Sequence, residues 1–329
     1  CNEVLRDLAF PAQCAFARAV GYDGLEIAPF TLSAEPHRLT AAETARLRHV
    51  AEDNGLAVTG LHWLLVTPQG LSITAPDAAI RSRTRDVLLG LLDLCAGLGG
   101  RVMVHGSPAQ RQVAAGQGEQ DAFAHARDMF AALAPEAGAR GITYCIEALA
   151  PPDNHFVTTL AEAARLVDAV AHPAFRTMID TSAASAHESE PVAGLIRRWM
   201  PTGHIAHVQL NDANRRGPGE GRDRFAPVLA ALAETGYAGD IAAAPGGGFV
   251  LSAQKQGRCL WWHPGAPEAL TLVAELLEPC ALAAAPDGAG VSISAGRGVA
   301  RWHARLAPRM MAWPAVLAPD NHWVRLAVA

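Results

Sequence analysis

The chain has 329 residues, half of them hydrophobic and 18% charged, so it can bury a sizeable core and is not an intrinsically disordered protein. Its formal net charge of -5 argues against a nucleic-acid partner, because such partners favour a basic surface. No apolar run approaches the roughly 18 residues of a membrane span, and no signal-peptide pattern is present. Six cysteines without a C-x-x-C pair are typical of a reducing compartment, so we expect a cytoplasmic protein without a membrane or nucleic-acid partner.

Strand-like and helix-like segments alternate along most of the chain. Short apolar segments predict strands over residues 24–30, 57–65, 101–107, 142–149, 177–181, the apolar start of 204–221, and 237–244. Amphipathic segments predict helices over residues 11–20, 40–55, 76–98, 120–139, 159–170, 191–200, 224–235 and 267–277. Strand ends recur roughly every 30 to 42 residues, and this alternation predicts parallel strands joined by right-handed crossovers.

The number of strands indicates the architecture. Seven strands are predicted, and the residues around Cys1 are expected to be the end of a truncated first strand. Eight strands over about 280 residues are typical of a (β/α)8 TIM barrel. The alternative is an open doubly wound sheet, which is disfavoured because no G-x-G-x-x-G follows the first strand. We therefore expect an α/β barrel over residues 1–280 and an irregular C-terminal extension over residues 281–329.

Polar side chains stand at or near the ends of six successive predicted strands. They are Glu26, His62, His105, Glu147, Asp180 and the pair His207 and Gln209. The C-terminal ends of the strands of a parallel barrel surround one mouth, where active sites lie. A charged or imidazole group in an apolar strand is costly unless it is paired or bound to metal. Any one of these residues could be a core or rim residue, but one per strand predicts an active site.

The residue types suggest a chemistry. Two carboxylates together with an imidazole or amide oxygen suit Mg²⁺ or Mn²⁺, with Zn²⁺ also acceptable. Such a cation beside a polyol polarises a carbonyl and stabilises an enediolate, while a carboxylate moves a proton between carbons. Arg215 and Arg216 precede a Gly-Pro-Gly turn and are expected to bind an anionic or hydroxylated substrate, the alternative being a solvated loop.

Several stretches together resemble a known family. They are Gly21-Tyr-Asp-Gly-Leu-Glu-Ile-Ala-Pro-Phe, Ile146-Glu147, Met178-Ile-Asp-Thr181 and His207-Val-Gln-Leu-Asn-Asp-Ala-Asn-Arg-Arg-Gly-Pro-Gly-Glu-Gly. In combination they resemble the sugar phosphate isomerase/epimerase family, the xylose isomerase-like TIM barrels. This group includes ketose 3-epimerases, hydroxypyruvate isomerases and endonuclease IV. The resemblance covers about residues 1–245.

The resemblance implies roles for individual residues. Glu147 and Asp180 correspond to metal ligands, and Glu147 also to an acid/base. Gln209 stands where ketose epimerases have a histidine ligand, and its amide oxygen can bind a hard metal. Arg215 corresponds to a substrate-binding arginine, and His62 to a position facing the substrate. His105 also corresponds to a position that faces the substrate. Glu26 and His207 are further expected substrate-binding residues.

The sequence departs from the family pattern at the last strand. Ala244 stands where the family has a glutamate that serves as fourth ligand and second acid/base. Because family-like sequence stops nearby and the composition changes, a shift of the reading frame near residue 243 would explain both features. Resequencing of the gene tests this hypothesis.

The sequence thus predicts a divalent-metal-dependent isomerase or epimerase that acts on a small sugar or hydroxy-carbonyl compound through an enediolate. One alternative is an impaired barrel that binds a carbohydrate-like ligand without turnover, and another is a metal-dependent lyase or dehydratase. An endonuclease IV-like nuclease is disfavoured by the acidic charge balance and by too few histidines in ligand positions. Assembly into a homo-oligomer is left open.

Overall fold

The computed structural model describes residues 1–19, 22–152, 154–218 and 221–243, together with the backbone of seven strands between residues 249 and 312. The chain divides into one compact unit of residues 1–14 and 23–245 and a second unit of residues 15–22 and 246–329. Within the described residues, no helix combines the length and the apolar character needed to cross a lipid bilayer.

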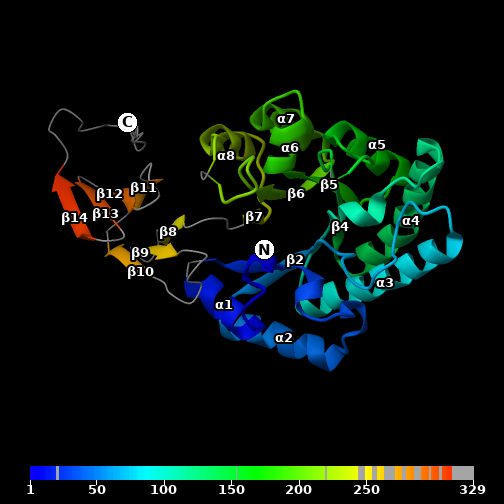
Figure 1. The fold of residues 1–329 in the computed structure, drawn as a ribbon, viewed down its shortest axis with the longest axis horizontal. Helices are drawn as coiled ribbons and strands as arrows, with labels where there is room; N and C mark the ends of the chain where they lie inside the picture. The colour runs from blue at the N-terminus through cyan, green and yellow to red at the C-terminus, as the bar shows by residue number, and fades with distance from the viewer. Residues whose placement is uncertain are drawn as a thin grey trace. The chain divides into compact units, whose positions relative to one another are not determined.

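The first unit is built on seven strands that pair in chain order. They are β1 (Gly24–Ile27), β2 (Ala57–His62), β3 (Val102–His105), β4 (Thr143–Glu147), β5 (Phe175–Asp180), β6 (Ile205–Leu210) and β7 (Ile241–Ala243). All the pairings are parallel, so the C-terminal ends of the strands meet at one rim. The strands form a nearly closed barrel, which confirms the predicted TIM-barrel fold (Figure 1).

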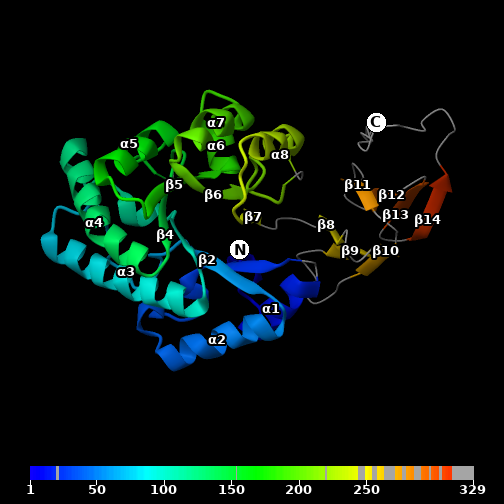
Figure 2. The ribbon, with the colours of Figure 1, turned by 180° about the vertical axis from the view of Figure 1, so that it is seen from behind.

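Helices alternate with these strands and surround the sheet (Figures 1 and 2). The α-helices are α1 (Phe10–Ala19), α2 (Ala41–Asp53), α3 (Ala78–Leu98), α4 (Glu119–Ala139), α5 (Leu160–Val170), α6 (Thr181–His187), α7 (Val192–Trp199) and α8 (Phe225–Glu234). Short 3-10 helices are η1 (Glu3–Leu5), η2 (Pro29–Thr31), η3 (Pro36–Arg38), η4 (Pro108–Arg111) and η5 (Met200–Thr202). The sequence patterns predicted all of these α-helices except α6.

Local sequence signals account for several helix ends. Thr40 and Glu43 form the predicted capping box of α2, because the Glu43 N–H donates to Thr40 Oγ1 and the Thr40 N–H donates to the Glu43 carboxylate. Thr159 likewise accepts a hydrogen bond from the Glu162 N–H at the start of α5. Gly99 ends α3 with a φ of +89°, a conformation that glycine adopts without steric cost.

The strands are buried on both faces, which is why they are almost continuously apolar in sequence. On the outer face, Ile179 of β5 and Val208 of β6 pack in one cluster with apolar residues of α7 and α8. In another cluster, Val104, Cys145 and Met178 pack together from three neighbouring strands. Side chains that fill both faces of the sheet fix the position of the strand ends that carry the polar residues.

The start of the chain runs alongside β1. The Asn2 N–H donates to the Glu26 carbonyl over 2.9 Å, and the Asn2 side chain accepts from the Ala28 N–H over 2.8 Å. Asn2 is fully buried. These contacts bring Cys1 and Glu3 to the rim of the barrel beside β1, where the sequence predicted the end of a further strand.

The described part of the second unit contains antiparallel strands. They are β8 (Phe249–Ala253), β9 (Arg258–Trp262), β10 (Thr271–Glu275), β11 (Pro279–Ala284), β12 (Gly290–Ala295), β13 (Gly298–His303) and β14 (Leu306–Ala312). The helix predicted over residues 267–277 is wrong where β10 forms, because pairing with β9 overrides the local helical period. The other residues of that predicted helix lie outside the described part of the chain.

Candidate active site

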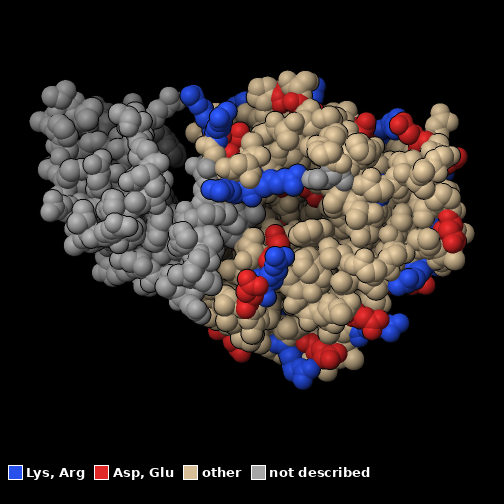
Figure 3. Space-filling model, viewed as in Figure 1, with Lys and Arg blue, Asp and Glu red and all other residues tan. Residues whose placement is uncertain are grey.

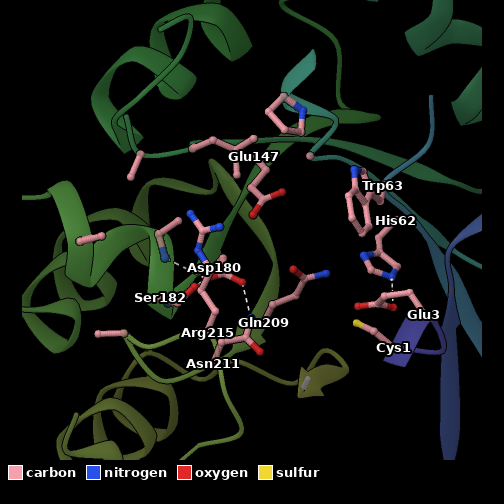
Figure 4. Close-up of a pocket in the computed structure, with 17 residues that line it drawn as sticks. Cys1, Glu3, His62, Trp63, Glu147, Asp180, Ser182, Gln209, Asn211 and Arg215 are labelled. Carbon is pink, nitrogen blue, oxygen red and sulfur yellow. Dashed lines mark hydrogen bonds and ion pairs between the residues drawn. The ribbon is translucent and has the colours of Figure 1, made fainter. Parts of the chain in front are cut away.

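A pocket of about 260 Å³ opens at the C-terminal ends of the strands. Figure 4 shows Cys1, Glu3, His62 and Trp63 along one side of it and Asp180, Ser182, Asn211 and Arg215 along the other, with Glu147 and Gln209 between them. The face seen in Figure 3 has a hollow near its centre, and acidic and basic side chains are interspersed over its described part. The pocket therefore lies where parallel barrels place their active sites.

The predicted site residues fall into two groups. Those that line the pocket are His62, Glu147, Asp180, Gln209 and Arg215. Three others are buried and do not line the pocket: Glu26 contacts Gln209, His207 contacts Glu26, and His105 contacts Tyr144 and Arg111. The pocket also contains residues that sequence reasoning missed, namely Cys1, Glu3, Trp63, Ser182 and Asn211. Ala244, the position that departs from the family pattern, lies outside the described residues.

Asp180 is the last residue of β5 and also the N-cap of α6. Its Oδ1 accepts hydrogen bonds from the Ser182 N–H, the Ser182 hydroxyl and the Ala183 N–H at 2.7 to 3.0 Å. Its Oδ2 accepts one from the Asn211 amide. Burial raises the pKa of Asp180 although these donors oppose the shift. The donors therefore hold the carboxylate in one orientation beside the pocket, with Oδ2 retaining a lone pair.

Glu147 is the last residue of β4 and faces Asp180 across the pocket lining. Burial and then the nearby charge of Asp180 raise the pKa of Glu147 to about 8. Gly106 lies directly against this carboxylate, since a Cβ at that position would overlap Glu147 Oε2. A larger residue at this position would displace the end of the Glu147 side chain. Two buried carboxylates thus lie close enough to repel one another when both are ionised.

Arg111 supports Glu147 from behind and was not predicted. It is fully buried in η4, and its guanidinium donates to the backbone carbonyls of Glu147 and His105. Burial lowers the pKa of Arg111 to about 10, which leaves the side chain cationic at neutral pH. The guanidinium therefore ties the ends of β3 and β4 together and places a positive charge near Glu147. No sequence pattern predicted this role, because arginine is usually a surface residue.

His105 belongs to this supporting layer and not to the pocket lining. It is fully buried at the end of β3, and its Nδ1 lies 2.9 Å from the Tyr144 hydroxyl. Burial, followed by the charge of Arg111, holds the pKa of His105 well below its ordinary value. A neutral imidazole that hydrogen-bonds a buried tyrosine stabilises the barrel interior, and its ring is not among the residues that line the pocket.

Gln209 takes its orientation from Glu26. The Gln209 Nε2 donates to Glu26 Oε2 over 2.8 Å, and both side chains are buried. A carboxylate only accepts hydrogen bonds, so this contact requires the amide nitrogen to face Glu26. The Gln209 carbonyl oxygen is consequently the atom left for the pocket. Glu26 is in turn held by His207, whose Nε2 lies 3.0 Å from Glu26 Oε1.

His62 closes the opposite side of the pocket. Its Nε2 lies 2.9 Å from Glu3 Oε2. Burial would lower the pKa of His62, but the charges of Glu3 and Glu26 outweigh this effect and raise it. Trp63 follows with a φ of +50° and packs edge-on against Phe30 at 5.4 Å between ring centroids. The indole is partly exposed and offers an apolar surface at the pocket mouth.

Arg215 lies in a loop that Asp212 shapes. Asp212 is fully buried after β6, and its carboxylate accepts hydrogen bonds from the Gly221 and Arg222 N–H groups. The Arg215 N–H donates to the Asp212 carbonyl, and Arg215 itself has a positive φ of +62°. Asp212 therefore closes the loop and directs Arg215 to the pocket rim. The polar run after β6 indicated this loop, but not that Asp212 is buried in it.

The profile of the family described as "Xylose isomerase-like TIM barrel" matches residues 14–245, which is most of the chain. The chain belongs to this family. A D-psicose 3-epimerase from Agrobacterium fabrum is 26% identical over 231 residues, covering 69% of this chain and 75% of that protein. A D-psicose 3-epimerase from Ruminiclostridium cellulolyticum is 30% identical over 113 residues, covering 34% of this chain and only 38% of that protein.

A solved structure supports the fold assignment. The crystal structure of a D-psicose 3-epimerase in the presence of D-fructose has a TM-score of 0.63 and 24% sequence identity, covering 74% of this chain and 81% of that chain. At 24% sequence identity, this similarity shows that the two proteins share the barrel fold. In this xylose isomerase-like barrel, His62, Glu147, Asp180 and Gln209 lie at the rim formed by the C-terminal ends of the strands, where the pocket opens.

The pocket contains a donor set that fits a hard divalent cation. Glu147 and Asp180 supply carboxylate oxygens, and the orientation of Gln209 supplies a carbonyl oxygen. Mg²⁺ and Mn²⁺ are commonly bound by such oxygens, whereas Zn²⁺ prefers nitrogen and sulfur. A cation between the two carboxylates would also relieve the repulsion that raises the pKa of Glu147.

The raised pKa of Glu147 predicts how stability varies with pH in the absence of divalent metal. Between about pH 4.5 and pH 8, folded protein retains a proton on Glu147 that the unfolded chain has released. The free energy of unfolding should therefore fall as the pH rises through this window. Thermal unfolding followed at several pH values, with wild-type protein and Glu147→Gln, measures the effect. A pH dependence that is the same in both proteins would contradict the prediction.

The lowered pKa of Glu26 predicts that the free energy of unfolding decreases as the solution becomes acidic. Burial alone would raise its pKa, but the contact with His207 lowers it to about 2, from an ordinary value of 4.5. The ionised carboxylate therefore contributes stability above about pH 4.5 that is lost as the pH falls toward 2. We expect the stability difference between wild-type protein and Glu26→Gln to be largest near pH 6 and to shrink through this window. Urea unfolding at fixed pH values measures this difference.

Proposed function

We propose that this protein is a divalent-metal-dependent isomerase or epimerase that acts on a small sugar or a related hydroxy-carbonyl compound. The observation that carries the proposal is the convergence of Glu147, Asp180 and the Gln209 carbonyl oxygen on one pocket at the ends of three successive strands. The relatedness to D-psicose 3-epimerases supports the same reaction class. We further propose a cytoplasmic location.

Glu147, Asp180 and Gln209 would hold the cation, with Mn²⁺ or Mg²⁺ preferred for an all-oxygen donor set. When bound, the cation supplies Lewis acidity that favours loss of a proton beside a carbonyl group. Asp180 is oriented by its hydrogen bonds from α6 and Asn211, which also oppose the rise in its pKa that burial causes. Glu26 keeps the Gln209 oxygen directed into the pocket.

Glu147 is the proposed proton-transfer group. Its carboxylate removes a proton from a carbon beside the carbonyl group and returns it to the same or the neighbouring carbon. The Arg111 guanidinium fixes the backbone beneath it, so the carboxylate retains its position as its charge changes. Around the substrate, Arg215 can donate to hydroxyl groups and Trp63 can pack on an apolar sugar face.

The identity of residue 244 bears on which product forms. Inversion at one carbon requires a second proton donor on the opposite face, and the family resemblance assigns that role to the position occupied by Ala244. A single base working on one face instead moves a proton between adjacent carbons, which is isomerisation. The same substitution favours a second candidate function, a barrel that binds a sugar without turnover.

Proton exchange in D₂O tests the proposal. The protein would be reconstituted with Mn²⁺ and incubated with a panel of ketoses that includes D-psicose and D-fructose, and carbon-bound deuterium would be followed by NMR. Metal-dependent exchange is the expected result, and the products distinguish isomerisation from epimerisation. Retention of bound sugar, seen by saturation-transfer NMR, with no exchange would favour the non-catalytic barrel. Metal-free protein after reconstitution, measured by elemental analysis, would overturn the metal-dependent mechanism.

A further inference from the structure

A second group of candidate metal ligands lies at the side of the pocket opposite Asp180. One ligand atom each from Cys1, Glu26 and His62 lie within 4.8 Å of one another. We propose that these three residues, with Glu3 beside them, form a separate site for a borderline-soft divalent cation such as Zn²⁺. None of its residues belongs to the set of Glu147, Asp180 and Gln209, and the two sets are linked only by the hydrogen bond from Gln209 to Glu26.

The geometry of the cluster suits a small cation. Bonds of roughly 2.0 to 2.3 Å around a tetrahedral Zn²⁺ place its ligand atoms about 3 to 4 Å apart. The Cys1 Sγ lies 3.0 Å from Glu26 Oε2, and His62 Nε2 lies 2.9 Å from Glu3 Oε2. Modest side-chain movements would therefore bring a sulfur, a nitrogen and carboxylate oxygens to coordination distance.

The contacts now present in the cluster are those that a cation can replace. The Cys1 S–H donates to Glu26 Oε2, and His62 Nε2 is hydrogen-bonded to Glu3 Oε2. On binding, the Cys1 thiol loses its proton to solvent, and His62 coordinates through a ring nitrogen as neutral imidazole. Two carboxylates and one thiolate then supply negative charge around the cation. Binding releases protons to solvent and involves no change of oxidation state.

Outer contacts support the cluster, and it is accessible from solvent. Glu26 Oε2 also accepts from the Gln209 amide, and Glu26 Oε1 lies beside the His207 ring, so the carboxylate is fixed from two sides. Such second contacts orient metal ligands and raise affinity. Cys1, Glu3 and His62 all line the pocket, which provides the entry path.

The donor types separate this site from the other set of candidate ligands. Sulfur and imidazole nitrogen select Zn²⁺ and Co²⁺, whereas the oxygens of Glu147, Asp180 and Gln209 suit Mn²⁺ and Mg²⁺. A cation bound at Cys1 would therefore have a thiolate-to-metal signature that a cation bound at Asp180 lacks.

Titration of the full chain with Co²⁺ tests the proposal. Wild-type protein should develop a near-ultraviolet thiolate-to-cobalt charge-transfer band, which Zn²⁺ then abolishes by competition. Cys1→Ser should lose the band and at least about tenfold in Zn²⁺ affinity, whereas Asp180→Asn should retain the band. Cys14→Ala, at a buried cysteine outside the cluster, serves as the matched control and should behave as wild type.

A measurement on the wild-type chain guards against variants that fail to fold. Zn²⁺ should slow alkylation of Cys1, identified by peptide mass spectrometry, while the same concentration of Mg²⁺ should not. Absence of the cobalt band in wild-type protein, or its persistence in Cys1→Ser, would overturn the proposal. Loss of the band in both Cys1→Ser and Asp180→Asn would also overturn it, because a single shared cation would then explain the data.

Discussion

Replacing Glu147 with glutamine is expected to slow carbon-bound proton exchange in the substrate by roughly two to four orders of magnitude. Glutamine keeps the shape of the side chain, but it cannot accept and return a proton. The backbone at this position remains tied to Arg111, so the strand end should not move. Deuterium incorporation with Mn²⁺ at saturating concentration measures the effect separately from any loss of metal affinity.

The matched control for this prediction is Glu43→Gln, the same substitution in the capping box of α2, away from the pocket. It should leave exchange unchanged and affect only the stability of that helix. Exchange in Glu147→Gln within about threefold of wild type would assign proton transfer to another group.

Replacing Asp180 with asparagine should lower the affinity for Mn²⁺ by at least about 100-fold. Loss of a residue that only hydrogen-bonds a metal ligand lowers metal affinity by roughly 10- to 100-fold, and loss of a ligand itself should cost more. Asparagine is also a good N-cap, so α6 should persist and stability should change by less than about 1 kcal/mol. Removal of the charge should also lower the pKa of Glu147, since Asp180 is one of the groups that raises it. Isothermal titration calorimetry measures the affinity, and NMR of labelled glutamate follows the titration.

Asp77→Asn is the corresponding control, because Asp77 is the N-cap of α3 and lies outside the pocket lining. Both variants replace an aspartate at a helix N-terminus by asparagine, but only Asp180 contributes to the candidate metal site. Equal metal affinities in the two variants would show that the carboxylate of Asp180 is not a ligand. Unfolding of Asp180→Asn alone would instead indicate a structural role.

Strand periodicity and helix signals were sufficient to predict the barrel and most of its helices. They also predicted which strand ends carry polar residues, since each of these positions follows a short apolar run. Helix α6 was missed because it follows β5 directly and has no apolar period of its own, its start being set by Asp180. The helix predicted over residues 267–277 failed because strand pairing is a long-range contact that local periodicity does not contain.

The direction of each side chain at the rim was beyond sequence reasoning. A shift of strand register by one residue reverses the face that a side chain occupies, and such a shift occurs between Leu25 and Glu26. Glu26 lies beneath the pocket, where it contacts His207 and Gln209. His207 and Gln209 are two residues apart on β6 and so share a face. They differ in depth, which is why only Gln209 lines the pocket.

The sequence by itself therefore determined the barrel and the placement of Glu147, Asp180 and Gln209 at the ends of successive strands, because these properties follow from local alternation. Only the tertiary structure decided that Glu26 orients Gln209, that Arg111 holds Glu147, and that Cys1 and Glu3 reach the pocket. Each of these contacts joins segments far apart in the chain. Their formation depends on barrel closure and side-chain burial, which no local sequence pattern specifies.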